Sequence, residues 1–304
     1  MSRKMATITN CDMPLLVKNI VPAMTSSHHK GQCGRIGILG GCKEYTGAPY
    51  FAGISALKVG ADLSHIFCTS DAASVIKSYS PELIVHPVLD DSNAVAEIKQ
   101  WLPRLHALVI GPGLGRDQAI FDTVKEVIEV AKLSNMVLVI DADGLFLVTQ
   151  TPAIITSYSK AILTPNKMEF SRLCEALQFK PTDSLTNDVC ELATRLGVTI
   201  VAKGAVDIIT NGKDTVTCDT GGSYRRCGGQ GDLLSGSLGT FAYWGHSVQP
   251  QPPIAPSVIA GYAACFLTRE CNSEAFATHK RSMTTTDMIS CIGRVFHQHF
   301  ETIV

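Results

Sequence analysis

The segment RRCGGQGDLLSG, residues 225–236, combines residue types that suit the transfer of a phosphoryl group. Its glycines free backbone N–H groups to turn toward a bound anion, and the apolar helix that follows adds the positive end of its dipole. A carboxylate would repel phosphate, so we expect Asp232 to remove the proton of a hydroxyl that attacks phosphorus. Arg225 and Arg226 could neutralise charge on the transferred group. The alternative, a helix-capping Asp232 with solvated arginines, accounts for less of this run.

Asn166 and Glu169 in the segment TPNKMEF (164–170) form a second candidate element. Their i, i+3 spacing places them on one face of a helix that begins here. An amide and a carboxylate at a strand end suit a hydrated Mg²⁺ that accompanies a nucleotide and is bound through water. The same pair is also typical of a helix cap with an acid in the first turn, and both interpretations stay open.

Three further segments place polar residues where strands are expected to end. Lys203 in the segment AKG could meet nucleotide phosphates or be a solvated residue at the rim. Asp141 and Asp143 in DADGL could bind metal or substrate, or cap the next turn. GPGLGRD (111–117) has glycines spaced differently from the dinucleotide fingerprint, and a tight strand-to-helix turn explains it equally well. In open α/β sheets, ligands gather at these strand ends.

Short apolar runs alternate with helical stretches, which predicts a parallel sheet covered by helices. Apolar residues recur at helical spacing between residues 120 and 131, and again from Asp232 onward. Asn211-Gly212 predicts a hairpin with a two-residue turn. The expected strands cover residues 35–39, 63–68, 83–88, 107–111, 136–141, 161–165, 198–204 and 206–210.

The composition argues against nucleic acid or a membrane as the main partner. The chain has 304 residues and a net charge of -1, and it contains no apolar run as long as a membrane span. We expect a flexible leader over residues 1–14 and one α/β domain over residues 15–304. The eleven cysteines form no C-x-x-C pair, which favours a reducing compartment. We therefore expect a cytoplasmic protein, with the mitochondrion as the alternative.

Together these blocks resemble the ribokinase-like superfamily, whose members use a G-x-G-D loop with a catalytic aspartate and an N-x-x-E element near magnesium. The match is closer to one family within it, the eukaryotic-type ATP-dependent (S)-NAD(P)H-hydrate dehydratases. The blocks HKGQCGRIGILGGCKEYTGAPYFAGISALKVGADL (29–63), GPGLGRD, DADGL, TPNKMEF, AKG and RRCGGQGDLLSG follow that family's order. The resemblance implies a three-layer α/β/α fold with a mostly parallel central sheet flanked by helices.

The resemblance also implies an activity, the repair of hydrated NADH and NADPH. The hydroxyl of the hydrate is phosphorylated by ATP and then expelled as phosphate, with Asp232 as the base and Mg²⁺ as cofactor. The small-molecule partners would be ATP and the hydrated coenzymes, and a homo-oligomer and a functional link to a separate NAD(P)HX epimerase are further expectations. Implied ATP contacts are Lys203, Gly204, Ala205, Val206, Asp207, Gly222, Ser223, Tyr224, Arg225, Arg226, Cys227, Gly228, Gly229, Gln230 and Gly231. Implied contacts with the hydrated coenzyme are Tyr45, Thr46, Gly113, Asn166, Lys167, Met168, Glu169, Phe170, Ser171, Arg172 and Asp232.

Three other functions account for the same residues less completely. A small-molecule kinase of this fold usually carries alanine or another small residue where Gln230 stands. A catalytically inactive nucleotide sensor has no chemical need for Asp232, Asn166, Glu169 and Lys203 together. An NAD-dependent dehydrogenase would need the dinucleotide fingerprint that this chain lacks.

Overall fold

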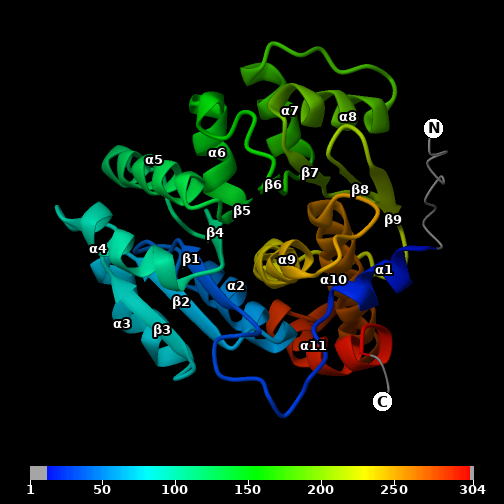
Figure 1. The fold of residues 1–304 in the computed structure, drawn as a ribbon, viewed down its shortest axis with the longest axis horizontal. Coiled ribbons are helices and arrows are strands. Elements are labelled where there is room, and N and C mark those ends of the chain that lie inside the picture. Colours follow the sequence, from blue (N-terminus) through cyan, green and yellow to red (C-terminus); the bar gives the residue numbers. More distant parts are fainter. Residues whose placement is uncertain (1–11, 302–304) are drawn as a thin grey trace.

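A computed structural model of the chain describes residues 12–301 and contains one nine-stranded sheet (Figure 1). The strand order is β3-β2-β1-β4-β5-β6-β7-β8-β9. All neighbouring strands from β3 to β7 pair in parallel, whereas β8 and β9 are antiparallel additions at one edge. The strands are β1 (Arg35–Leu39), β2 (Leu63–Cys68), β3 (Leu83–Pro87), β4 (Ala107–Ile110), β5 (Val137–Ile140), β6 (Ala161–Leu163), β7 (Thr199–Ala202), β8 (Asp207–Thr210) and β9 (Thr215–Cys218).

Helices cover both faces of this sheet and complete three layers (Figure 1). One face carries α1 (Met13–Ile20), α2 (Gly47–Val59), α3 (Ser70–Tyr79), α9 (Gln230–Ser247), α10 (Pro256–His279) and α11 (Thr285–His299). The other face carries α4 (Ala94–Trp101), α5 (Gln118–Leu133), α6 (Ala142–Gln150), α7 (Lys167–Ala176) and α8 (Leu185–Leu196). The predicted α/β/α architecture with a mostly parallel sheet is confirmed.

Side chains of each central strand enter two separate cores. In β4, Ala107 and Val109 pack under α9 and its neighbours, whereas Leu108 and Ile110 pack under the helices of the opposite face. Successive side chains of a strand alternate between the faces, so a strand with helices on both sides must be apolar throughout. This requirement explains the continuous apolar runs in the sequence.

The structure differs from the sequence expectations in two local details. The β8–β9 hairpin has a four-residue connection from Asn211 to Asp214, so the predicted two-residue turn is wrong. Asn211 Oδ1 accepts hydrogen bonds from the backbone N–H groups of Lys213 (2.9 Å) and Asp214 (2.7 Å), which stabilises the wider loop. Helix α9 begins at Gln230 rather than at Asp232.

The predicted leader, residues 1–14, lies outside the described residues except for its last three. Of these, Met13 and Pro14 belong to α1. Within residues 12–301, no helix is both long and apolar enough to cross a membrane. All ten cysteines in this part of the chain carry free thiols.

Candidate active site

Three neighbouring parallel strands end beside the first turn of α9. Asp141 follows β5, Thr164 follows β6 and Lys203 follows β7. Lys203 Nζ donates a hydrogen bond to Asp141 Oδ1 at 2.9 Å and lies 3.9 Å from Glu169 Oε2. Because a Cβ atom on Gly231 would lie 3.4 Å from Lys203 Nζ, the glycine loop before Asp232 reaches this cluster. Residues of four separate sequence motifs therefore meet at the carboxyl ends of β5, β6 and β7.

Asp232 lies in the first turn of α9, and its surroundings make it a strong base. Burial raises the pKa of its carboxyl group well above the ordinary value. The nearby carboxylate of Asp141 raises this pKa further, and Lys203 offsets part of the shift. A carboxylate with a raised pKa accepts a proton from a hydroxyl more readily, as general base catalysis requires.

Lys203 remains charged at this site although it is largely buried. Burial lowers its pKa, but Asp141, Glu169 and Asp232 together outweigh that effect and raise the pKa above the ordinary value. Glu169 shows the opposite balance, because burial raises the pKa of its carboxyl group and Lys203 only partly offsets this rise. The site thus holds one fixed positive charge among three acidic side chains.

Asn166 and Glu169 form a capping box at the start of α7. Asn166 Oδ1 accepts hydrogen bonds from the backbone N–H groups of Met168 (2.9 Å) and Glu169 (3.0 Å). Glu169 Oε2 in turn accepts from the backbone N–H of Asn166 at 2.7 Å. The helix-cap interpretation is therefore confirmed, and this same cap holds the Glu169 carboxylate near Lys203. The predicted role of the pair near Mg²⁺ stays a prediction.

A pocket of about 520 Å³ opens next to this cluster, between the loop after β7 and the loop before α9. Many of the residues expected to contact ATP line it, and so does Asn166. These ATP-contact residues are Lys203, Gly204, Ala205, Asp207, Gly222, Arg226, Cys227, Gln230 and Gly231. A pocket of this size, with three glycines and several polar side chains in its lining, suits a nucleotide.

Six of the expected ATP contacts do not line the pocket: Val206, Ser223, Tyr224, Arg225, Gly228 and Gly229. Tyr224 is fully exposed. Arg225 donates hydrogen bonds to the carbonyl oxygens of Met283 (3.3 Å) and Arg226 (3.0 Å). Of the two arginines, Arg226 lines the pocket and Arg225 does not.

The sequence analysis missed the contribution of α10 to the pocket. Cys265, Thr268, Arg269 and Asn272 line it, together with Leu234 of α9. The α10 residues stand at positions i, i+3, i+4 and i+7 on one face of the helix, but any helix face has this spacing, so the pattern alone gives no sign of a nucleotide site. Only the packing of α10 beside both loops makes them part of the site.

Of the residues expected on the coenzyme side, Tyr45 and Gly113 meet where the chain leaves β1 and β4. Gly113 has a φ of 61°, and a Cβ atom there would lie 2.5 Å from the carbonyl oxygen of Tyr45, so only glycine fits. Tyr45 is 58% exposed, and the Thr46 hydroxyl lies 2.9 Å from that of Tyr79. The remaining residues, Lys167–Arg172, occupy the first turns of α7, where Phe170 packs into the core and Met168 is exposed.

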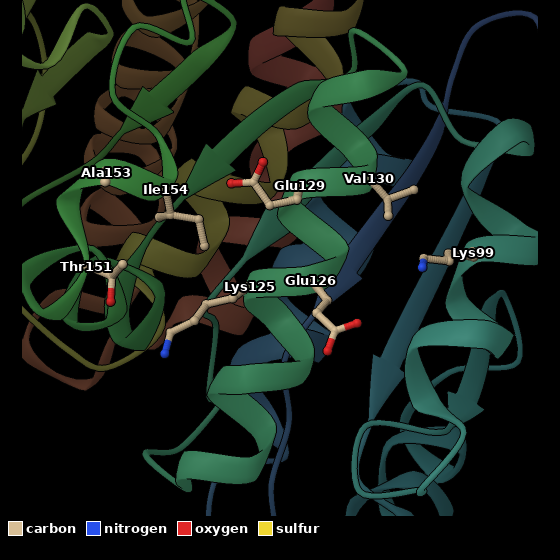
Figure 2. Close-up of a pocket in the computed structure, with 8 residues that line it drawn as sticks. All are labelled: Lys99, Lys125, Glu126, Glu129, Val130, Thr151, Ala153 and Ile154. Carbon is tan, nitrogen blue, oxygen red and sulfur yellow. The ribbon is translucent and has the colours of Figure 1, made fainter.

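A second hollow, of about 460 Å³, lies between α4, α5 and the segment after α6 (Figure 2). It is lined by Lys99, Lys125, Glu126, Glu129, Val130, Thr151, Ala153 and Ile154. None of these residues belongs to a motif that the sequence singled out. Figure 2 shows the lysine and glutamate side chains spread along the helices without converging on one point. We therefore assign the chemistry to the cluster around Asp232 at the carboxyl ends of β5, β6 and β7.

Comparison with known proteins identifies the family of this chain. The family model described as NAD(P)H-hydrate dehydratase matches residues 36–294. The ATP-dependent (S)-NAD(P)H-hydrate dehydratase of Mus musculus is 60% identical over 292 residues, which cover 94% of this chain and 85% of the mouse protein.

Two solved structures share the fold at lower identity. A ribokinase-like superfamily protein of Enterococcus faecalis has a TM-score of 0.78 at 22% identity, covering 94% of each chain. The ADP/ATP-dependent NAD(P)H-hydrate dehydratase of Bacillus subtilis, co-crystallised with ATP and Mg²⁺, has a TM-score of 0.71 at 21% identity and covers 95% of this chain and 97% of its own. The fold, the extent of the family match and the identity to the mouse protein together show that this chain belongs to the NAD(P)H-hydrate dehydratase family.

Proposed function

We propose that this chain dehydrates (S)-NADHX and (S)-NADPHX to NADH and NADPH at the expense of ATP. The observation that carries the proposal is the position of Asp232. It lies in the first turn of α9 near Lys203, and the pKa of its carboxyl group is raised. The 60% identity to the ATP-dependent (S)-NAD(P)H-hydrate dehydratase of Mus musculus supports the choice of substrate.

The first chemical step is phosphorylation of the hydroxyl group of the hydrated nicotinamide ring. Asp232 accepts the hydroxyl proton while the oxygen attacks the γ-phosphorus of ATP, so that an O–P bond forms and the bond to ADP breaks. Backbone N–H groups at the start of α9 and the charge of Lys203 face the negative charge that develops on the phosphoryl oxygens.

The second step is elimination. The ring nitrogen lone pair expels phosphate by breaking the C–O bond, and loss of a proton from the neighbouring carbon restores the double bond. Phosphate is a far better leaving group than hydroxide, which explains why one ATP is consumed for each coenzyme repaired.

The donor set fits a Mg²⁺ ion that enters with ATP. Among residues 12–301, no group of three or more His, Cys, Asp and Glu side chains gathers to hold a metal, so these residues offer no complete ligand shell. Mg²⁺ usually keeps several waters and takes one or two carboxylates together with substrate phosphates. Asp141 and Glu169, which both lie near Lys203, can supply these carboxylates, with Asn166 acting through water. When bound, the ion would neutralise phosphate charge.

A direct assay tests the proposal. The purified chain is mixed with (S)-NADHX, Mg²⁺ and either ATP or ADP, and regenerated NADH is followed by its near-ultraviolet absorbance. We expect recovery with ATP, and a loss of about 10²–10⁴-fold in kcat for Asp232→Asn because the general base is removed.

The exposed Asp219 provides a matched control, since Asp219→Asn removes the same charge outside the pocket lining and should leave the rate unchanged. Absence of NADH recovery with the folded wild-type protein would reject the dehydratase function. Full activity of Asp232→Asn would instead reject Asp232 as the base.

We further propose that the enzyme works in the cytoplasm, with the mitochondrion as the alternative, and beside an epimerase that interconverts the two forms of the hydrate. The free thiols support a reducing compartment. An epimerase is needed because an enzyme selective for the S form leaves the R form unrepaired. Fractionation of cells followed by detection of this chain tests the location, and gel filtration tests the proposed homo-oligomer.

A further inference from the structure

Both loops that line the nucleotide pocket are fastened to one face of α10. Arg269, Asn272 and Ser273 stand at positions i, i+3 and i+4 of this helix, so their side chains project from the same face. Arg269 holds the loop after β7, and Asn272 and Ser273 hold the loop before α9. A single rigid helix therefore sets the relative position of the two walls.

Arg269 fixes the loop after β7 through three hydrogen bonds. Its Nε donates to Asp207 Oδ2 at 2.7 Å, and its second guanidinium nitrogen donates to the carbonyl oxygens of Gly204 (3.0 Å) and Ala205 (2.9 Å). The other oxygen of Asp207 accepts from the backbone N–H of Gly204 at 2.8 Å. One carboxylate oxygen of Asp207 thus bonds α10 and the other bonds the loop, so this side chain, which lines the pocket, also joins the loop to the helix.

Asn272 fixes the loop before α9 with both ends of its amide. Its Oδ1 accepts from the backbone N–H of Ser223 at 2.6 Å, and its Nδ2 donates to the carbonyl oxygen of Arg225 at 3.4 Å. Ser273 Oγ accepts from the backbone N–H of Gly222 at 2.7 Å. Asn272 is 4% exposed, so water cannot replace these bonds if the amide is removed.

We infer that Asn272, Ser273 and Arg269 are positioning residues that hold the two loops open at the spacing a nucleotide requires. The inference rests on the proposed function in one respect, namely that ATP occupies this pocket. Without these side chains the loops must be ordered at the moment of binding, and the cost of ordering them appears as weaker ATP binding. None of the three side chains bonds a residue expected to contact the hydrated coenzyme, so the coenzyme should bind as before.

The experiment compares the two KM values in the same protein. For Asn272→Ala we expect the KM for ATP to rise about tenfold, the effect of losing about 1.4 kcal/mol, with the KM for (S)-NADHX unchanged. Ser273→Ala removes only one hydrogen bond and should raise the KM for ATP about threefold, as expected for roughly half that free energy. If Asn272→Ala folds poorly, the KM of Ser273→Ala for ATP still tests the positioning role.

Cys271→Ala is the matched control. Cys271 is fully buried in the same helix, next to Asn272, but it does not line the pocket. This substitution should lower thermal stability without changing the KM for ATP. A general loss of stability would change the KM for both substrates in all three variants. A positioning role would raise only the KM for ATP, and only in Asn272→Ala and Ser273→Ala.

Calorimetric titration of each variant with a non-hydrolysable ATP analogue separates this inference from the proposed function. If the wild-type protein binds the analogue but repairs no (S)-NADHX, the proposed function fails while the titrations still test the inference. If wild-type repair is normal and Asn272→Ala and Ser273→Ala bind the analogue as tightly as the wild type, the positioning role is overturned.

Discussion

Lys203 and Asp141 form an ion pair that links the ends of β5 and β7 across the intervening strand β6. The side chain of Asp141 is only 2% exposed and that of Lys203 is 20% exposed, with 2.9 Å between Nζ and Oδ1. The Thr164 hydroxyl, from the end of β6, donates to the same Asp141 oxygen at 2.7 Å. The Asp141 carboxylate thus contacts residues at the ends of β6 and β7, and it lies close enough to Asp232 to raise the pKa of that side chain.

Breaking this pair should destabilise the protein. Asp141→Asn keeps an acceptor for Thr164 but leaves the Lys203 ammonium largely buried without its nearest counter-charge, which should cost about 2–3 kcal/mol. Asp141→Asn combined with Lys203→Met should lose less than the sum of the single losses, because neither charge is then left alone. Urea unfolding of the four proteins measures the coupling. Strict additivity would show that the pair contributes nothing.

Replacement of Asp232 should stabilise the folded state at neutral pH. The pKa of Asp232 is raised in the folded protein, so the folded state binds this proton more tightly than the unfolded chain. Stability is therefore lost as pH rises from the unfolded pKa to the folded pKa. Asp232→Asn removes this penalty and should raise the Tm at pH 7, with a smaller gain at about pH 4. A gain in Tm independent of pH would contradict the electrostatic explanation.

The same carboxyl group should control the pH dependence of the reaction. Only the ionised form of Asp232 accepts a proton, so kcat should increase with pH through its raised pKa and then level off. The rates are measured with saturating ATP and (S)-NADHX to exclude effects on binding. The residual activity of Asp232→Asn should lack this rise, and a rise that persists in the variant would assign the titration to another group.

Glu169→Gln distinguishes the capping role of this residue from a role near Mg²⁺. Glutamine can also close a capping box, so stability should change by less than about 1 kcal/mol. Loss of the negative charge near Lys203 should nevertheless raise the Mg²⁺ concentration needed for half-maximal rate several-fold. Titration of the rate with Mg²⁺ at fixed ATP measures this. An unchanged requirement would limit Glu169 to the helix cap.

Gly236 of α9 packs closely against α2, and its replacement should disturb the helix that carries Asp232. A Cβ atom at Gly236 would lie 2.0 Å from the carbonyl oxygen of Ala52, so Gly236→Ala must push the two helices apart and should cost about 2–3 kcal/mol.

Gly293 in α11 is the matched comparison, because it is exposed and a Cβ atom there would meet nothing within 4 Å. Gly293→Ala should therefore stabilise the protein by about 0.5–1 kcal/mol. Thermal unfolding of both variants measures the contrast, and similar shifts in the same direction would contradict the packing argument.

The fold class and most of the motifs of the site are predictable from local sequence patterns. Buried parallel strands are recognisable because both of their faces must be apolar, and the expected strand at residues 107–111 matches β4 closely. Glycine-rich loops before helices can also be recognised from local sequence, because their backbone N–H groups, φ angles and helix dipole depend on neighbouring residues. For this reason Asp232 and Lys203 could be chosen before their positions in space were known.

The interactions among these residues depend on contacts between distant segments of the chain. Asp141 and Lys203 are 62 positions apart, and Arg269 lies 62 positions from Asp207, so no local pattern could pair them. The turn after β8 was also mispredicted, because the Asn211 side chain binds backbone N–H groups that the dipeptide rule leaves out. Burial, charge coupling and loop spacing arise from segments that meet only when the sheet is assembled, and these properties turn the motifs into a site.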